Sequence, residues 1–247
     1  MLAVSSRAGR YYLVSLNYEP YSYSRNGTYT GYDVEILKEC FRRMGDDLEI
    51  DLVPWKRALS MGMTGNSDGV FGIFKLPERA EKMFFSDPVR AEEISFFVRD
   101  DSTLVFDGDL NQLKNSTFGT VSGYSYGDEV DSFLKNAIPK SHVEVGVSPE
   151  MNLVKLIKGR FDIYIGDTLS TLSSIHKMGL EGLIRRLKPS INTSDVHVAF
   201  SRKLKLGRVR DRFNDALESM RLDGTLERIK MKYFHEQSKD KKVNAVE

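Results

Sequence analysis

The segment FGIFKLPERAEK places an arginine where it could bind an anion. An apolar run that is typical of a buried strand ends at Phe74, and Pro77 can take the first position of a helix, where its missing N–H costs no hydrogen bond. Arg79 would then lie in the first helical turn, beside backbone N–H groups at the positive end of the helix dipole. A guanidinium in that position suits a carboxylate. The alternative is a solvated arginine on an ordinary surface helix, and the local sequence leaves both interpretations open.

Asp167 is the candidate for binding a cation. It follows the apolar run FDIYIG, so it is expected at the carboxyl end of a buried strand, where open α/β sheets place their ligands. A carboxylate there could bind an ammonium group. The same residue could instead cap the helix that follows, because an aspartate side chain accepts hydrogen bonds from first-turn N–H groups.

The stretch TFGTVSGYSYGDEV indicates a strand, a glycine-containing turn and the start of a helix. Ser122, Ser125 and neighbouring backbone N–H groups could bind a second oxygen of an anion. Residues 123–127 also match G-x-S-x-G, the pattern around the serine nucleophile of α/β hydrolases. A hydrolase needs a histidine base and an oxyanion loop as well, and no histidine precedes this serine. We therefore expect a binding turn and not a nucleophile.

Aromatic residues gather near the start of the chain, where five tyrosines lie between residues 18 and 32. Tyr18 and Tyr21 fall on the loop expected after the first strand, and Trp55 follows the second strand. At the ligand end of a sheet such rings could form the wall of an apolar pocket. Packing in the core is the alternative, and it requires no ligand.

The composition argues against several functional classes. Lys and Arg total 36 against 35 Asp and Glu, so a net charge of +1 provides no general field for nucleic acid, and we expect no nucleic-acid partner. No apolar run approaches the roughly 20 residues of a membrane-spanning helix. The four histidines show no metal-ligand spacing, and the single cysteine, Cys40, is expected to be a packed core residue. We expect neither a metal nor a cofactor.

Strand and helix patterns alternate along the chain, which predicts mostly parallel sheets covered on both faces. Asp33 is expected to cap a helix that runs to Met44, and the polar tail after Tyr233 is expected to fray. Strands are expected at residues 12–16, 48–53, 69–74, 94–98, 117–121, 143–147, 161–166 and 196–200, and residues 17–31 are expected to form a loop. Helices are expected at residues 33–44, 56–63, 126–136, 150–158, 168–178, 207–222 and 226–233.

Several short motifs follow one another in a recognisable order between residues 11 and 234. Each is short, but together their order and spacing resemble the family 3 solute-binding proteins, the periplasmic amino-acid-binding components of ABC transporters. The motifs are Glu19-Pro20-Tyr21, Gly31-Tyr32-Asp33-Val34-Glu35, Pro77-Glu78-Arg79, Phe85-Ser86-Asp87-Pro88, Gly159-Arg160-Phe161-Asp162 with Asp167, Asp223-Gly224-Thr225-Leu226 and Lys232-Tyr233-Phe234.

The resemblance implies an α/β, two-lobed, periplasmic-binding-protein-like fold of type II. Each lobe would be a mostly parallel sheet flanked by helices, and two crossing hinge strands would join the lobes. The first lobe would contain residues 1–97 and 198–247, the second residues 98–197, and the hinge strands would lie near 94–99 and 195–200. The ligand would lie in the cleft between the lobes.

Four residues would bind the head group of an amino-acid-like ligand when the family's roles are carried over by position. Arg79 would bind the α-carboxylate, and Asp167 would bind the α-ammonium. Ser125 would add its hydroxyl and its backbone N–H to the carboxylate site. Gly72 would offer its backbone carbonyl to the ammonium group.

The remaining expected ligand contacts are aromatic. Tyr18 and Trp55 match positions that surround the ligand side chain, and Tyr124 lies beside Ser125. Phe74 departs from the family, whose members usually carry Ser or Thr at that position. The missing hydroxyl removes one hydrogen bond and the ring adds bulk, so the departure indicates a ligand other than a standard polar amino acid.

Binding without catalysis is the main interpretation, and no enzymatic activity is expected. The family also resembles cyclohexadienyl dehydratases, which use the same cleft for acid-catalysed elimination, and Glu19 or Asp167 would then be the acid. A further alternative is the sensor domain of a membrane receptor or kinase, which uses the same pair of lobes.

The resemblance implies a periplasmic monomer whose partners are a small amino-acid-like ligand and a membrane ABC permease. The N-terminus MLAVSSRAGRYYLV is too short and too interrupted for a signal peptide. From the residues alone the chain is either cytoplasmic or a mature form whose signal peptide has been removed. The resemblance favours the mature form.

Overall fold

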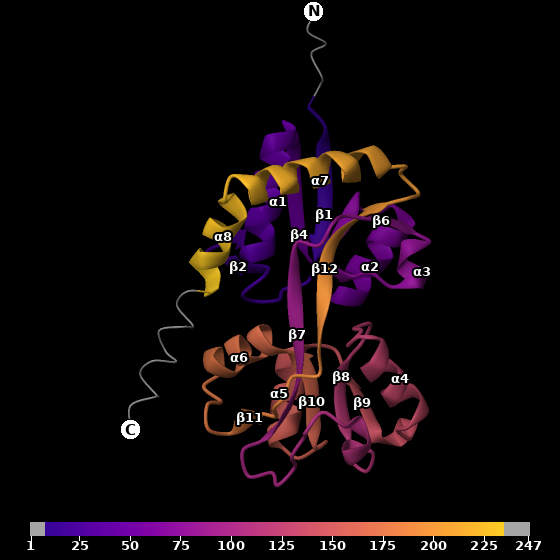
Figure 1. Cartoon of the computed structure of the whole chain (residues 1–247), viewed down its shortest axis with the longest axis vertical. Helices are drawn as coiled ribbons and strands as arrows, with labels where there is room; N and C mark the ends of the chain where they lie inside the picture. Colours follow the sequence, from indigo (N-terminus) through magenta and orange to yellow (C-terminus); the bar gives the residue numbers. More distant parts are fainter. Residues whose placement is uncertain (1–7, 235–247) are drawn as a thin grey trace, which may run out of the picture. The chain divides into compact units, whose positions relative to one another are not determined.

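The computed structural model describes residues 8–234 (Figure 1). By their internal contacts these residues form two units: unit 1 is the chain up to Val89 together with the chain from Val196 onward, and unit 2 is Arg90–Asp195. The chain therefore crosses between the units twice. The lobe boundaries expected from the sequence, residues 97 and 197, lie within the two strands at these crossings, residues 90–99 and 192–201. The assignment of the lobes stays a prediction. His235 and the polar tail lie outside the described residues.

Unit 1 is built on three parallel strands. β1 (Arg10–Ser15) lies between β4 (Asp47–Leu52) and β5 (Gly69–Phe74). Val14 of β1 and Val70 of β5 are fully buried. Strands that are covered on both faces require apolar residues at consecutive positions, which is why β5 is the uninterrupted apolar run GVFGIF.

Antiparallel strands extend this sheet. From Val196 onward, β12 (Asn192–Ser201) runs antiparallel to β5, and β6 (Met83–Phe85) pairs with β12. A separate hairpin of β2 (Tyr23–Arg25) and β3 (Thr28–Thr30) lies in the segment that the sequence predicted to be a loop. That prediction was wrong because three-residue strands are too short to show an alternating pattern.

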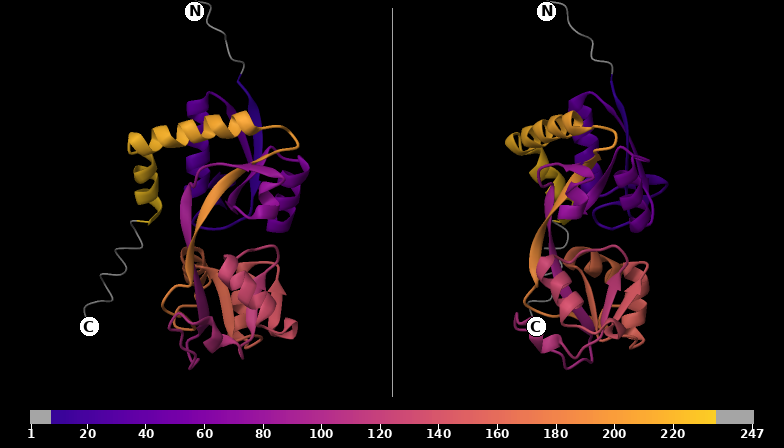
Figure 2. Two further views of the ribbon diagram at one scale, coloured as in Figure 1. Left: turned by 45° about the vertical axis from the view of Figure 1, so that its right-hand side comes forward. Right: turned by 90° about the vertical axis from the view of Figure 1, so that its right-hand side faces the viewer.

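The helices of unit 1 are α1 (Tyr32–Met44), α2 (Trp55–Thr64), the four-residue α3 (Pro77–Ala80), α7 (Gly207–Leu222) and α8 (Thr225–Phe234). α1 packs against α7, the long orange helix in both views of Figure 2. Cys40 is fully buried in α1, and burial raises the pKa of its thiol to about 12, so it is a core residue as expected. Asp33 is not the cap of α1: Gly31 occupies the N-cap position, and Asp33 lies inside the first turn.

Unit 2 repeats the same plan with its own set of three parallel strands. β8 (Phe118–Val121) lies between β9 (Val143–Gly146) and β10 (Ile163–Asp167), and the three strands are parallel. β7 (Arg90–Arg99) is antiparallel to β10, and β11 (Ile184–Arg186) is antiparallel to β7. β11 is a further short strand that the sequence did not predict.

The helices of unit 2 are α4 (Asp128–Asn136), α5 (Pro149–Ile157) and α6 (Thr168–Lys177), with two short 3-10 turns, η1 (Leu110–Leu113) and η2 (Lys140–His142). Leu153 and Leu156 of α5 pack with Phe97 of β7 and with Phe161 in one buried cluster. Both units thus combine parallel strands with helices, which confirms the predicted α/β class. Across residues 8–234 no helix combines the length and the apolar character needed to cross a bilayer.

Candidate functional site

Three expected site residues of unit 1 lie on segments that begin at the same edge of its sheet. Because β1, β4 and β5 are parallel, their carboxyl ends meet at one edge, where α/β sheets place ligands. The segments that follow these strands carry Tyr18, Trp55 and Arg79. Trp55 is 8% exposed at the start of α2. Tyr18 is half-buried in a tight turn that its backbone closes with Ser22, and its ring lies 5.7 Å from the ring of the buried Tyr21.

Arg79 is 6% exposed and lies just beyond the end of β5. Its Nη1 donates a hydrogen bond to the carbonyl oxygen of Phe74 at 3.2 Å, and this bond ties the guanidinium to the strand end. α3 has only four residues, so it cannot supply the dipole that was expected to assist anion binding. Any anion bound here would be held by the guanidinium.

Gly72 adopts a left-handed backbone conformation within β5. Its φ angle is +73°, and the pairing of β5 with β12 shifts register at this residue, between His197 and Val198. A β-bulge of this kind turns the local backbone and is common beside binding sites. A Cβ atom at Gly72 would lie 3.4 Å from Ser15 Oγ and 3.6 Å from Asp33 Oδ2. The carbonyl groups around Gly72 therefore point in directions that a regular strand would not give.

Asp33 lies close to the expected site residues, and the sequence did not predict this placement. Its side chain is 1% exposed and lies beside Gly72, so a carboxylate is buried at the edge where Trp55 and Arg79 emerge. The sequence signal for this placement is an acidic residue in the first turn of a helix that follows a loop at the sheet edge. The same signal also predicts a helix cap, which is why the placement was missed.

The turn after β8 holds Ser125 in a fixed network. Ser125 Oγ donates to Asp131 Oδ2 at 2.5 Å and accepts from the backbone N–H of Gly127 at 3.4 Å, while Tyr126 N donates to Asp131 Oδ1 at 3.0 Å. The hydroxyl of Ser125 therefore already donates its proton to Asp131. The backbone N–H of Ser125 is the better candidate for donating a hydrogen bond to a bound anion. The partner of the hydroxyl is an aspartate and not a histidine, so the G-x-S-x-G match forms a turn and no nucleophile.

Tyr124 and Tyr126 anchor this turn. The ring of Tyr124 packs against the buried cluster that contains Val121 and Leu153, and burial raises the pKa of its phenol well above the usual value. Tyr126 is 3% exposed, and its hydroxyl accepts a hydrogen bond from the backbone N–H of Val121 at 2.7 Å. Burial also raises the pKa of Tyr126. Both phenols are therefore neutral at physiological pH and serve to hold the turn.

Asp167 caps the helix that follows it, and it also lies at the strand end where a ligand-binding carboxylate was expected. It is 2% exposed at the carboxyl end of β10, and its Oδ1 accepts a hydrogen bond from Ser170 N at 2.8 Å, which makes it the N-cap of α6. The next residue, Thr168, bonds to the backbone carbonyl of Glu93 at 2.8 Å and to Ser95 Oγ at 2.7 Å. These contacts fix the start of α6, and with it the orientation of Asp167.

Comparison of the sequence with models of known protein families gives a match over most of the chain. The model of the bacterial extracellular solute-binding proteins, family 3, matches residues 12–236. The chain belongs to this family. The family and the periplasmic-binding-protein-like fold expected from the sequence are thereby confirmed.

Named relatives agree with this membership. The chain is 26% identical to the "Probable amino-acid-binding protein YxeM" of Bacillus subtilis (strain 168), over 88% of this chain and 80% of that protein. It is also 26% identical to the "L-cystine-binding protein TcyA" of the same organism, over 89% of this chain and 78% of that protein. Among solved structures, a histidine kinase sensor domain similar to periplasmic binding proteins superposes with a TM-score of 0.82 at 21% identity, over 92% of this chain and 96% of that domain. That last likeness shows the fold alone.

Several motif residues of this solute-binding protein have structural roles. Asp162 Oδ2 accepts hydrogen bonds from Thr117 N at 2.8 Å and from Thr117 Oγ1 at 2.7 Å, which joins the starts of β10 and β8. Glu35 of α1 accepts hydrogen bonds from Lys232 and Tyr233 of α8. Part of the order of motifs along the chain thus reflects packing of the family fold.

Proposed function

We propose that this chain binds a small amino-acid-like solute through Arg79 and Asp167. The observation that carries the proposal is the placement of these two buried charges, each at the carboxyl edge of the parallel strands in its own unit. A zwitterionic solute offers an opposite charge to each of the two residues, and charge-assisted hydrogen bonds of this kind are stronger than neutral ones.

The head group of the solute would then be divided between the units. Arg79 and the backbone N–H of Ser125 would bind its carboxylate, and Asp167 and the carbonyl of Gly72 would bind its ammonium group. Tyr18, Trp55 and Phe74 emerge at the sheet edge of unit 1 and would contact the apolar part of the solute. In this proposal one solute needs both units, which is also the expected basis of hinge closure.

The capping role of Asp167 favours binding over elimination chemistry. Its Oδ1 accepts a backbone hydrogen bond at the N-terminus of α6, and that position stabilises a negative carboxylate. An anionic carboxylate can bind an ammonium group but cannot donate the proton that acid-catalysed elimination requires. The names of the curated relatives also describe binding proteins. Elimination from a cyclohexadienyl substrate, catalysed by the purified protein, would contradict this view.

Import is the role that we propose for the bound solute. The protein would act as an extracytoplasmic monomer and deliver the solute to a membrane ABC permease, as the family description and the names of relatives support. A sensor role is the other outcome, since a sensor domain shares the fold. Uptake of the identified solute by cells that lack the protein separates the two roles. Reduced uptake supports import, and unchanged uptake with a lost transcriptional response supports sensing.

A thermal-shift screen is the experiment that tests binding. Amino acids, polyamines and small peptides are screened, because a ligand that binds only the native state raises Tm. We expect at least one amino-acid-like compound to raise Tm, and we expect Arg79→Ala and Asp167→Asn each to abolish that rise. A compound that stabilises both variants as well as the wild type would contradict the proposed site.

A further inference from the structure

A groove that includes neither Arg79 nor Asp167 lies within unit 2 between α4 and the edge strand β9. Its volume is about 530 Å³, within the range of small-molecule sites. Figure 1 shows α4 beside β8 and β9. Its lining includes residues 122–124 of the turn after β8, together with Asp131, Leu134, Lys135, Lys140, Val143 and Val145. All of them belong to one unit, so the shape of this groove does not depend on how the two units are placed.

The floor of the groove is apolar. Val143 and Val145 are two residues apart on β9 and so face the same side of the sheet, and Thr120 of β8 is paired with Val145. Leu134 of α4 also lines the groove. Val145 is nevertheless 59% exposed, because α4 leaves the outer part of β9 uncovered. The apolar part of a small bound molecule could cover this exposed surface.

Positive charge lies along the rim. Lys135 and Lys140 line the groove and are exposed, and neither makes an ion pair within residues 8–234. The acidic residue of the lining, Asp131, accepts hydrogen bonds from Ser125 Oγ and Tyr126 N, which disperse its charge. The groove therefore combines an apolar floor with two lysines that form no ion pair in the part of the chain that the structure describes.

We propose that this groove is a second binding site, for a small amphipathic anion that carries one carboxylate or sulfonate on an apolar body. The apolar body would lie on Val143 and Val145, and the anionic group would lie between Lys135 and Lys140. This site is distinct from the proposed solute site, which depends on Arg79 and Asp167. The two share the turn that follows β8, so binding in the groove should alter the affinity for solute, and solute should alter binding in the groove by the same factor.

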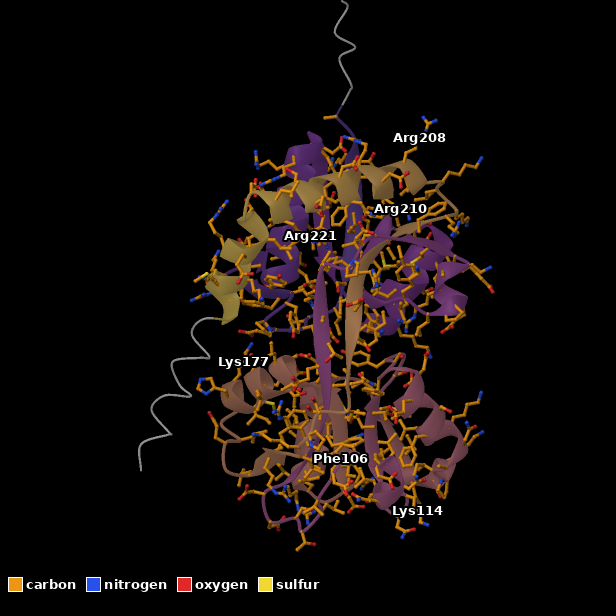
Figure 3. All side chains as sticks on the ribbon, in the orientation of Figure 1. Phe106, Lys114, Lys177, Arg208, Arg210 and Arg221 are labelled. Carbon is orange, nitrogen blue, oxygen red and sulfur yellow. The ribbon has the colours of Figure 1, made fainter. Side chains whose placement is uncertain are left out.

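Titration with anilinonaphthalene sulfonate, an apolar sulfonate whose fluorescence rises in apolar sites, tests the proposal. The double variant Lys135→Glu/Lys140→Glu should raise the Kd at least tenfold. The matched control Lys114→Glu/Lys188→Glu makes the same charge change at exposed lysines of unit 2 that do not line the groove, and it should change the Kd less than twofold; Lys114 is labelled in Figure 3. Equal effects of the two double variants would overturn the proposal.

Three further measurements separate this site from others. Octanoate should displace the probe, and octylammonium, which has the same chain and the opposite charge, should not. Val145→Glu places an anion on the exposed floor without removing a lysine, and it should weaken binding as the lysine variants do. Arg79→Ala should leave the probe Kd unchanged. Displacement by octylammonium, full binding by Val145→Glu, or loss of binding in Arg79→Ala would each contradict a groove site, whatever becomes of the solute site.

Discussion

Arg79 presents several N–H donors in one plane, and this geometry distinguishes it from a lysine. One of them, Nη1, bonds to the carbonyl of Phe74 at 3.2 Å. A guanidinium can keep that bond while another donor faces a carboxylate, and a lysine ammonium cannot reproduce the two-pronged contact. We expect Arg79→Lys to weaken solute binding at least tenfold, or about 1.4 kcal/mol, and to lower the Tm of the unliganded protein by only a few degrees. Calorimetry and scanning fluorimetry measure the two effects. A variant that melts much lower but binds normally would identify Arg79 as a purely structural residue.

Phe74 is the position at which the family resemblance leads us to expect a hydroxyl-bearing residue instead of a ring. Its ring is half-buried at the end of β5. A hydroxyl there would add a hydrogen bond to a carboxylate, worth about 1.5–3 kcal/mol, whereas the ring favours apolar ligand surface by roughly 25 cal/mol per Å². Phe74→Ser should therefore improve the binding of small polar amino acids and weaken the binding of the natural solute, as measured by calorimetry. Micromolar binding of glutamine, arginine or histidine by the wild type would contradict this interpretation.

Some individual roles could be predicted from the sequence and others could not. The placement of Asp167 at a strand end followed from its apolar neighbours, and so did the burial of Cys40. The hydrogen bond of Ser125 to Asp131 could not be foreseen, because it depends on the exact path of the turn. The placement of Asp33 beside Gly72 also escaped prediction, since it requires a bulge in β5 that no local pattern reveals. Whether the expected ligand contacts bind solute stays a prediction.

α1 is joined to the junction of α7 and α8 by a cluster of charges. Glu39 accepts hydrogen bonds from Arg42 Nε at 2.7 Å and Arg43 Nε at 2.8 Å, and Arg43 Nη2 contacts Asp223 Oδ2 at 2.7 Å. The hydrogen bonds from Arg42 and Arg43 lower the pKa of Glu39 from 4.5 to about 2. Because the folded-state pKa lies below the unfolded value, Glu39 stabilises the fold above about pH 4.5. This contribution is lost as the pH falls towards 2.

Glu39→Gln should therefore lower Tm at neutral pH, and the difference from the wild type should shrink as the pH approaches about 2. Thermal unfolding followed by circular dichroism over this range checks the expectation. Glu81→Gln is the control, because Glu81 is exposed and makes no ion pair among the described residues. It should leave Tm unchanged at every pH. A constant Tm difference for Glu39→Gln across the range would show that the carboxylate charge is not involved.

The long elements were predicted closely and the short ones were not. β5 and α7 have the predicted bounds, because a continuous apolar run and a helical period over sixteen residues are strong local signals. β6 and β11 have three residues each and form only by pairing with β12 and β7, which are remote in the sequence. Their conformation comes from tertiary pairing, so no propensity within the segment could reveal them.

Ligand-driven closure is the expected behaviour of the whole chain. The chain crosses between its units only after Val89 and after Asp195, and the proposed solute needs residues of both units. A solute that contacts both units favours the state in which both contacts are made. Small-angle scattering should show a smaller radius of gyration at saturating solute. Arg79→Ala should keep the larger value under the same conditions. An unchanged radius for the wild type at saturation would contradict hinge closure.

Because the chain crosses between the units twice, the two units are completed at different times during synthesis. Unit 2 is one continuous stretch, Arg90–Asp195, whereas unit 1 cannot be completed until β12, α7 and α8 have been synthesised. Unit 2 can therefore fold while the first part of unit 1 still lacks the strand that pairs with β5. Truncated chains that end at Asp195 and represent the nascent state should show a protease-resistant core within residues 90–195 and rapid cleavage within residues 8–89. The unpaired edge of β5 in such nascent chains is then the surface that a chaperone must shield during synthesis.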